Sequence, residues 1–425
     1  MISPARQAAL KALLRYRQSS TLEQIVCERQ DDARLAEHIV YGVLQNERFL
    51  DHCLSAYLPN SLARVHPKLL DILRLSAFQI LFLDRVPASA AVNQGVQMCR
   101  NAKMAYASGM VNAVLRRISE NRDQMLSQNL DAGLRYSHPG WLTECLLRDY
   151  DESFVRAFCM SNQSLPALRL QVNTDKTDLD SFLRMLKDSS IEIIAVNRDF
   201  SSVLIPSAKV ESIPGYSQGL FYVQDDAARA SVRAAGIKQG QTVLDACAAP
   251  GGKSMAAALD GGVVTACDVN GKRLQSCREN FERLQMTIPV RQLDASVSVP
   301  AYVGAFDVVI ADVPCSGTGV IHKHPEIRCR TRQEVEQLLP VQAQILDSVS
   351  EYVRPGGVLI YSTCSVLREE DEAQVESFLR KHNDYLLDPI CMDGFQCESG
   401  MLRSWPQLNH NDGFFAARLI RQETP

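Results

Sequence analysis

Residues 243–253 read VLDACAAPGGK, and this stretch decides the fold. Its first four residues, Val243–Ala246, predict a buried strand that begins with two apolar residues. Small residues then lead through Gly251 and Gly252 into a predicted helix that begins near Ser254. Small side chains let a backbone approach a ligand, and the amides at a helix N-terminus favour negative groups. The stretch predicts a ligand-binding loop between a strand and a helix. It is not a P-loop, because it meets only half of the GxxxxGK[ST] pattern.

Strands and helices alternate over residues 226–425. Besides the strand in VLDACAAPGGK, strands are predicted at Val263–Cys267, Val290–Leu293, Val308–Ala311 and Val358–Tyr361. Alternation at this spacing predicts an α/β fold, a doubly wound sheet with right-handed crossovers.

Two regions of different character precede this α/β domain. Residues 1–135 show only helical stripes of leucine, isoleucine and valine, which predict an all-α bundle. Residues 136–225 predict a small α+β module. Its predicted elements are a helical segment Trp141–Cys159, strands Leu168–Val172, Ile191–Val196 and Val203–Ile205, and a helix Leu179–Leu186.

Composition narrows the class of protein. A chain of 425 residues predicts two or three domains. Its 13 cysteines are odd in number and none are spaced C-x-x-C, so neither a disulfide framework nor a metal site is indicated. The sequence has no run of about 18 apolar residues and no signal-peptide pattern at its N-terminus, so we expect a cytoplasmic protein without a membrane partner.

Residues 1–135 carry 17 Lys and Arg against 12 Asp and Glu, whereas the whole chain has a net charge of −4. A basic domain joined to an acidic one keeps a specific RNA partner open.

Aspartates end four successive predicted strands, at Asp245, Asp268, Asp294 and Asp312. Any one of them alone could simply cap the next helix. An acid at the end of the second strand can also bind the diol of a ribose. Four in succession favour a nucleoside cofactor.

Two cysteines stand at the ends of apolar runs: Cys315 in DVPCSG and Cys364 in YSTCS. Carbon-5 of a pyrimidine is a poor nucleophile, so alkylating it requires a thiolate to add at carbon-6. An acid that donates to N3 of a cytosine favours this addition, and a protonated Asp312 would be such an acid. After alkylation the carbon-5 proton must leave and the attached thiol must be eliminated. A second group near the base would assist this step, and Cys315 is placed for it. Lys253 either balances charge at such a site or is a solvated lysine of the first helical turn.

A basic run follows the first thiol, from Ile321 to Arg328, with Arg330 and Arg332 beyond it. It either contacts an RNA backbone entering the site or forms a solvated loop before a helix at Glu334–Val353.

Together, residues 245–253, the stretch DVPCSGTG at 312–319 and the stretch STCS at 362–365 resemble the RNA cytosine-5 methyltransferases of the Nol1/Nop2/Sun group. Two further stretches, 71–79 with 112–117 and 219–225, resemble a NusB-like RNA-binding domain and the family's entry into its catalytic domain.

The resemblance implies three domains: a NusB-like bundle (1–135), the small α+β module (136–225) and a Rossmann-like methyltransferase domain (226–425). It implies that Cys364 is the nucleophile and that Cys315 acts in product release. It implies S-adenosyl-L-methionine as the cofactor and 16S rRNA, naked or in an early small-subunit intermediate, as the partner of a monomer. The cofactor contacts would be Cys247, Ala248, Ala249, Pro250, Gly251, Gly252, Lys253, Asp268, Asp294 and Asp312.

Other functions remain open from the sequence. A DNA cytosine-5 methyltransferase would use Cys315 as nucleophile and leave Cys364 without a role. A cytosine-5 methyltransferase acting on another RNA would carry the same motifs. A non-catalytic RNA-binding or antitermination protein would need neither thiol, and a methyltransferase for proteins or small molecules would need no cysteine pair.

Overall fold

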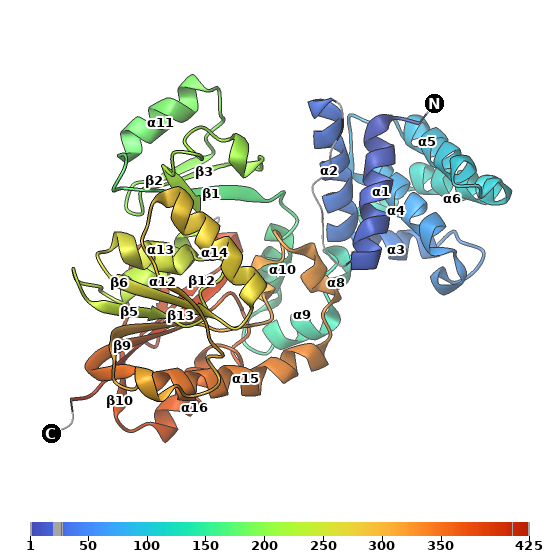
Figure 1. The fold of residues 1–425 in the computed structure, drawn as a ribbon. Coiled ribbons are helices and arrows are strands. Elements are labelled where there is room, and N and C mark those ends of the chain that lie inside the picture. Colours follow the sequence, from blue (N-terminus) through green and yellow to red (C-terminus); the bar gives the residue numbers. More distant parts are fainter. Residues whose placement is uncertain (1, 20–26, 28, 410, 424–425) are drawn as a thin grey trace. The chain divides into compact units, whose positions relative to one another are not determined.

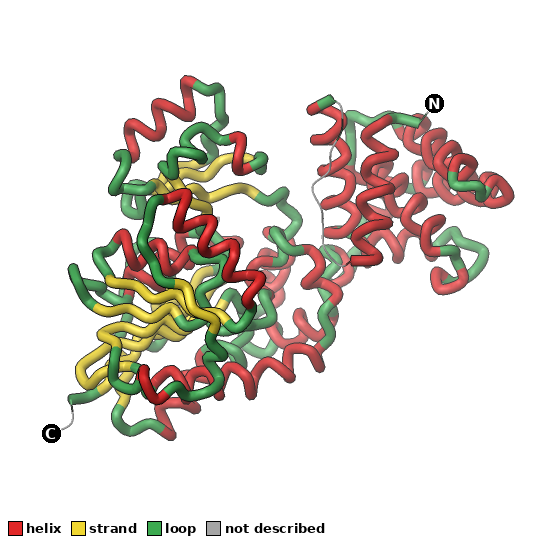
Figure 2. Tube along the Cα trace, viewed as in Figure 1, coloured by secondary structure: helices red, strands yellow, loops and turns green. Residues whose placement is uncertain are grey.

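The computed structural model describes residues 2–19, 27, 29–409 and 411–423. The chain forms two compact units, one of Met1–Leu165 with Ile321–Cys329, and one of Pro166–Val320 with Arg330–Pro425. Figure 2 shows helices without strands in the first unit and both sheets in the second.

The first unit is a helical bundle, and its residues 2–130 share one apolar core. Its α-helices are α1 (Pro4–Ser19), α2 (Gln30–Gln45), α3 (Glu47–Ser55), α4 (Pro67–Phe82), α5 (Ala88–Asn101), α6 (Ser108–Glu120), α7 (Arg122–Leu126), α8 (Ala132–Arg135), α9 (Gly140–Leu146) and α10 (Glu152–Ser161). The prediction of one helical segment from 141 to 159 was wrong. Asp151 begins a new helix there because its carboxylate accepts a hydrogen bond from the Phe154 amide at 2.8 Å.

The second unit contains a small antiparallel sheet in the order β2-β3-β1-β4. Its elements are β1 (Ala167–Val172), α11 (Leu179–Asp188), β2 (Ala195–Asn197), β3 (Ser202–Pro206) and β4 (Phe221–Val223). Helix α11 packs its apolar side on this sheet (Figure 1). Strand β2 is shorter than predicted, since residues 191–194 are not strand.

The large sheet of this unit runs β11-β12-β13-β9-β8-β5-β6-β7, with β10 paired to β13. Its strands are β5 (Thr242–Asp245), β6 (Val263–Asp268), β7 (Val290–Gln292), β8 (Phe306–Asp312), β9 (Val353–Thr363), β10 (Tyr385–Asp388), β11 (Gln396–Glu398), β12 (Met401–Ser404) and β13 (Phe414–Arg421). Strands β5 to β9 pair in parallel, and β13 pairs antiparallel to β9. The parallel part confirms the predicted strands, whereas β10 to β13 were not predicted.

Helices cover both faces of the large sheet (Figure 1). They are α12 (Asp226–Ala234), α13 (Gly252–Leu259), α14 (Gly271–Leu284), α15 (Arg332–Ser350), α16 (Glu372–Lys381) and the short α17 (Pro406–Asn409). Neighbouring residues of one strand point to opposite faces: Val308 joins the core under α12 to α14, and Val309 the core under α15 and α16. Burial on both faces explains why these strands are continuous apolar runs. The predicted helix 334–353 ends early, because Val353 begins β9.

Candidate active site

Two adjacent parallel strands bring the two predicted reactive cysteines together. The last residue of β8, Asp312, is paired in register with Ser362 of β9. The loops after these strands carry Cys315 and Cys364, whose Sγ atoms lie 3.3 Å apart, within hydrogen-bonding distance. Both residues are half-buried. Strand β5 lies between β6 and β8, so the strand order reverses beside these loops, which is where open α/β sheets bind ligands.

Two glycines let the loops around the thiols approach closely. The Gly319 amide donates to the Cys364 carbonyl at 2.9 Å, and the Gly413 amide donates to the Gly319 carbonyl at 2.8 Å. A Cβ placed on Gly319 would lie 2.0 Å from the Gly413 carbonyl oxygen. A side chain at position 319 would therefore force the two loops apart.

A buried carboxylate, Glu370, holds the turn that carries Cys315. Its two oxygens accept from the Ser316 amide at 2.8 Å and from the Ser316 hydroxyl at 2.5 Å. Gln342 of α15 donates to the same carboxylate at 2.9 Å and to the Pro314 carbonyl at 3.0 Å. Sequence reasoning missed Glu370, because one acid in the run EEDE gives no signal of its burial.

A second buried network lies under Cys364. The Thr363 hydroxyl donates to Asp371 at 2.5 Å, and Arg403 forms ion pairs with Asp371 at 3.1 Å and with Glu372 at 2.6 Å. Arg403 comes from β12, one of the strands that were not predicted, so the sequence could not place it here. Burial raises the pKa of Asp371, and Arg403 opposes that rise.

The surroundings of Cys315 favour its neutral thiol. The hydrogen bond with Cys364, burial and the charges of Cys364 and Glu370 all raise the pKa of Cys315. A thiol in this state is a hydrogen-bond donor rather than a nucleophile.

Lys253 lies beside these loops, in the first turn of α13. Its Nζ is 2.7 Å from Asp312 Oδ2 and 4.9 Å from the centre of the Phe414 ring. Asp312 also accepts from the Ser362 hydroxyl at 2.9 Å. Lys253 is only 8% exposed, so it is not the solvated lysine that the sequence left open.

The predicted cofactor loop, residues 247–253, joins β5 to α13. The Ala249 amide donates to Asp268 Oδ2 at 3.2 Å, which fastens the loop to the end of β6. Gly251 has a φ of +107°, and a Cβ there would lie 2.8 Å from the Phe281 ring. The loop therefore needs glycine at this position for both its conformation and its packing.

The strand-end aspartates fall into different environments. Asp245 is fully buried and accepts from the Ser254 hydroxyl at 2.6 Å, and burial raises its pKa to about 7. Asp268 is also buried, at the end of β6. Asp294, after β7, is exposed and accepts from the amide and hydroxyl of Ser296, which lowers its pKa. Asp245 thus anchors α13, while Asp268 ends β6, Asp312 ends β8 and Asp294 follows β7.

One cation of the basic run after Cys315, Arg328, is buried. Ile321–Cys329 belongs to the helical unit. Arg328 is 6% exposed and donates to the carbonyls of Asn162 at 2.8 Å and Ile321 at 3.3 Å. Burial lowers its pKa to about 9. Arg328 is therefore a buried structural residue rather than a phosphate contact.

Comparisons with known proteins agree with this architecture. Residues 234–420 match the family described as 16S rRNA methyltransferase RsmB/F, residues 3–120 match the NusB family, and residues 138–208 match the ferredoxin-like domain of RsmF/B-like methyltransferases. A ribosomal RNA small subunit methyltransferase B of Erwinia tasmaniensis is 33% identical over 397 residues, which cover 92% of this chain and 91% of that protein. The chain belongs to the RsmB/F family.

Solved structures support the same fold. PH0851 aligns with a TM-score of 0.80 at 24% identity, over 100% of this chain and 99% of its own. NSun6 from Pyrococcus horikoshii, solved with SFG, aligns with a TM-score of 0.61 at 18% identity, over 67% of this chain and 99% of its own. Likeness at these identities shows the fold alone. The predicted fold class and the predicted family of rRNA methyltransferases are confirmed.

Membership of the RsmB/F family places the chain among enzymes that modify RNA. Among the described residues, no helix is long and apolar enough to cross a membrane. The same residues contain no group of three or more histidine, cysteine, aspartate or glutamate side chains arranged to hold a metal ion.

Proposed function

We propose that this chain transfers a methyl group from S-adenosyl-L-methionine to carbon-5 of one cytosine in 16S rRNA through a covalent cysteine adduct. The observation that carries the proposal is the pair of thiols 3.3 Å apart at the ends of neighbouring parallel strands. Family membership supports the rRNA substrate. A binding protein or a methyltransferase for small molecules has no need of such a pair.

The loop of residues 247–253 fits the cofactor. Its small side chains allow a ligand to approach the backbone closely, and Asp268 retains free lone pairs for a ribose diol beside its bonds from Ala249 and Asn270. Asp294 presents an exposed carboxylate at the next strand. When bound, S-adenosyl-L-methionine supplies an electrophilic methyl group.

In this proposal each catalytic residue has its own role in the addition step. The Cys364 thiolate forms a bond to carbon-6, and the electron pair of the 5,6 double bond moves toward carbon-5 as N3 takes a proton. Asp312 presents that proton to N3. The proton comes from the Lys253 ammonium, whose Nζ lies 2.7 Å from Asp312 Oδ2, and it passes through the Asp312 carboxyl group.

Cys315 acts when the product leaves. Once carbon-5 has taken the methyl group, its proton departs to water, the bonding pair restores the 5,6 double bond, and the carbon–sulfur bond breaks with its pair on Cys364, while N3 returns its proton through Asp312. The neutral Cys315 thiol donates a hydrogen bond to the departing sulfur across the 3.3 Å contact. The raised pKa of Cys315 suits a donor better than a base.

The test compares wild type, Cys364→Ala and Cys315→Ala with 16S rRNA and S-adenosyl-L-methionine, scoring 5-methylcytidine and gel-stable protein–RNA adducts. We expect Cys364→Ala to give neither product nor adduct and Cys315→Ala to accumulate adduct. Loss of the adduct in Cys315→Ala alone would assign the nucleophile to the thiol used by DNA-type enzymes. Methylation of another RNA in preference to 16S rRNA would overturn the substrate.

Several features of the protein in the cell remain proposals. We propose that it acts as a cytoplasmic monomer on naked 16S rRNA or on an early small-subunit intermediate. We also propose that the three domains expected from sequence are functional divisions of the chain.

A further inference from the structure

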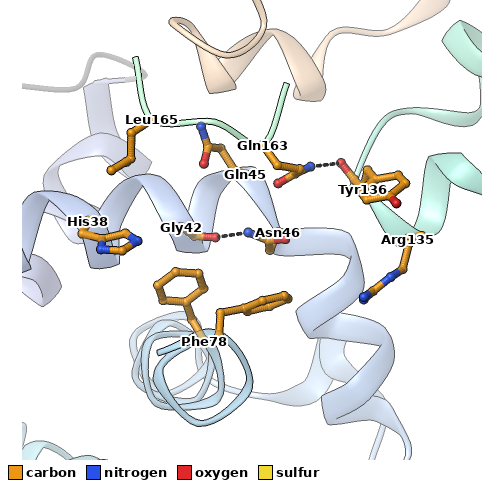
Figure 3. Close-up of a pocket in the computed structure, with 10 residues that line it drawn as sticks. His38, Gly42, Gln45, Asn46, Phe78, Arg135, Tyr136, Gln163 and Leu165 are labelled. Carbon is orange, nitrogen blue, oxygen red and sulfur yellow. Dashed lines mark hydrogen bonds between the residues drawn. The ribbon is translucent and has the colours of Figure 1, made fainter. Parts of the chain in front are cut away.

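The helical unit contains a cavity of about 250 Å³ that the proposed catalytic chemistry does not use (Figure 3). It lies between α2, α4 and two segments near the end of the unit. Its lining residues are His38, Gly42, Gln45, Asn46, Phe78, Phe82, Arg135, Tyr136, Gln163 and Leu165. None of the predicted catalytic or cofactor residues lines it.

One wall of the cavity is aromatic. The rings of Phe78 and Phe82 lie 5.4 Å apart between centres, and His38 meets Phe78 edge-on at 6.0 Å. A Cβ on Gly42 would lie 1.9 Å from the Phe78 ring, so glycine at this position lets the ring rest directly on α2. Phe78 is buried, whereas Phe82 is half-buried and keeps part of its surface exposed. Exposed aromatic surface is what unstacked nucleobases pack against.

The cavity is lined by a cationic side chain but by no carboxylate. The Arg135 guanidinium lies 4.6 Å from the centre of the Phe49 ring and has no side-chain hydrogen bond or ion pair among the described residues. Burial lowers the pKa of His38, so this ring is neutral at pH 7. The cavity therefore carries one positive charge with no negative charge to balance it.

Gln163 provides an unused acceptor. Its Nε2 donates to the Tyr136 carbonyl at 2.6 Å, which fixes the orientation of the amide. Its Oε1 is buried, has no partner among the described groups and points toward the cavity (Figure 3). Buried acceptors are nearly always paired, so this oxygen favours a ligand that brings an N–H or O–H donor.

We propose that this cavity binds one unstacked nucleotide of the RNA substrate, with its base against Phe82, a base N–H on Gln163 Oε1 and its phosphate on Arg135. The volume suits one base and not a longer segment, since pockets for drug-sized ligands begin at about 300 Å³. A free inorganic anion would leave the aromatic wall unused, and an acyl chain would leave the guanidinium and the amide unused. The inference rests on the proposed function, because it takes RNA as the substrate.

The test measures the affinity of the full chain for a labelled single-stranded 16S rRNA fragment at fixed salt, together with the KM and kcat for its methylation. The variants are Arg135→Gln, which removes the phosphate contact, and Phe82→Leu, which removes the stacking ring without changing charge. The control is Arg122→Gln. It removes the same charge from an ion pair with the exposed Asp84 in the same unit, outside the cavity.

We expect both cavity variants to bind RNA five- to twentyfold more weakly and to raise KM by a similar factor at unchanged kcat, while Arg122→Gln changes affinity less than twofold. Equal weakening by Arg135→Gln and Arg122→Gln would show that only overall charge matters and would overturn the proposal. Wild-type affinity in Arg135→Gln would overturn it as well, even if Phe82→Leu failed to fold. A wild-type chain that methylates no RNA would instead refute the proposed function.

Discussion

Replacing Glu370 by alanine is expected to release the turn that carries Cys315. The fully buried carboxylate of Glu370 accepts three hydrogen bonds, two from Ser316 and one from Gln342. Truncation leaves the Ser316 amide without a partner, whereas the Ser316 hydroxyl keeps its contact with Thr318 and Gln342 keeps its bond to the Pro314 carbonyl. At about 1–3 kcal/mol for the one buried unsatisfied donor and about 0.5–1.5 kcal/mol for each of the two other lost hydrogen bonds, discounted for water entering the space, the turn should lose roughly 2–4 kcal/mol. Glutamine keeps an acceptor for the Ser316 amide and for Gln342, so Glu370→Gln should cost only about 1 kcal/mol.

Three assays check this prediction. Hydrogen exchange of the peptide containing Ser316 should become about 100-fold faster in Glu370→Ala, because 1.4 kcal/mol corresponds to about tenfold. The methylation kcat of Glu370→Ala should fall by a similar factor, and that of Glu370→Gln by less than tenfold. The matched control is Glu369→Gln, the neighbouring half-exposed acid that pairs with Arg332, and it should change neither quantity. Unchanged exchange in Glu370→Ala would refute the reasoning.

The effect of the Glu370 charge on the pKa of Cys315 can be measured separately from the loosening of the turn. The titratable groups that face Cys315 are Cys364, Glu370 and Tyr361, and the Glu370 charge contributes to the raised pKa of Cys315. In a Cys364→Ser background, Glu370→Gln should therefore lower that pKa and move the alkylation profile of Cys315, followed by peptide mass spectrometry, toward lower pH. A turn that is merely loosened would react faster at every pH with the midpoint unchanged.

Three further predictions test other parts of the site. Gly319→Ala should abolish methylation while leaving the helical unit folded by circular dichroism, because its Cβ meets the Gly413 carbonyl oxygen at 2.0 Å. Burial raises the pKa of Asp245 to about 7 from an ordinary value near 4, so the folded state binds the extra proton between these limits and stability falls as pH rises from about 4 to about 7. Asparagine at that position should remove this slope in urea unfolding, and a slope that persists would contradict the assignment. Arg403→Met should cost about 3–5 kcal/mol because it leaves Asp371 buried without its cation, and Arg403→Lys should recover part of that loss in the same assay.

The parallel strands and the cofactor loop were predictable because their signals are local. Strands β5, β6 and β8 are short runs buried on both faces, so continuous apolar residues reveal them without knowledge of their neighbours. The break in the helical segment after Leu146 was missed, although the capping residue Asp151 was a local signal for it. Strands β10 to β13 were missed because their pairing partners lie elsewhere in the chain, and a short strand without its partner has no distinct pattern.

The sequence by itself singled out the residues to which we assign the chemistry. Cys315, Cys364, Lys253 and Asp312 stand next to strand ends, and in a parallel sheet the carboxyl ends of strands share one edge.

Only the tertiary structure decided how these groups are held and charged. It showed that Glu370 and Arg403 fix the turns beside the thiols, that Lys253 pairs with Asp312, and that Arg328 is buried in the helical unit. The physical reason is that burial and ion pairing depend on which distant segments meet, and no local pattern of residues encodes that.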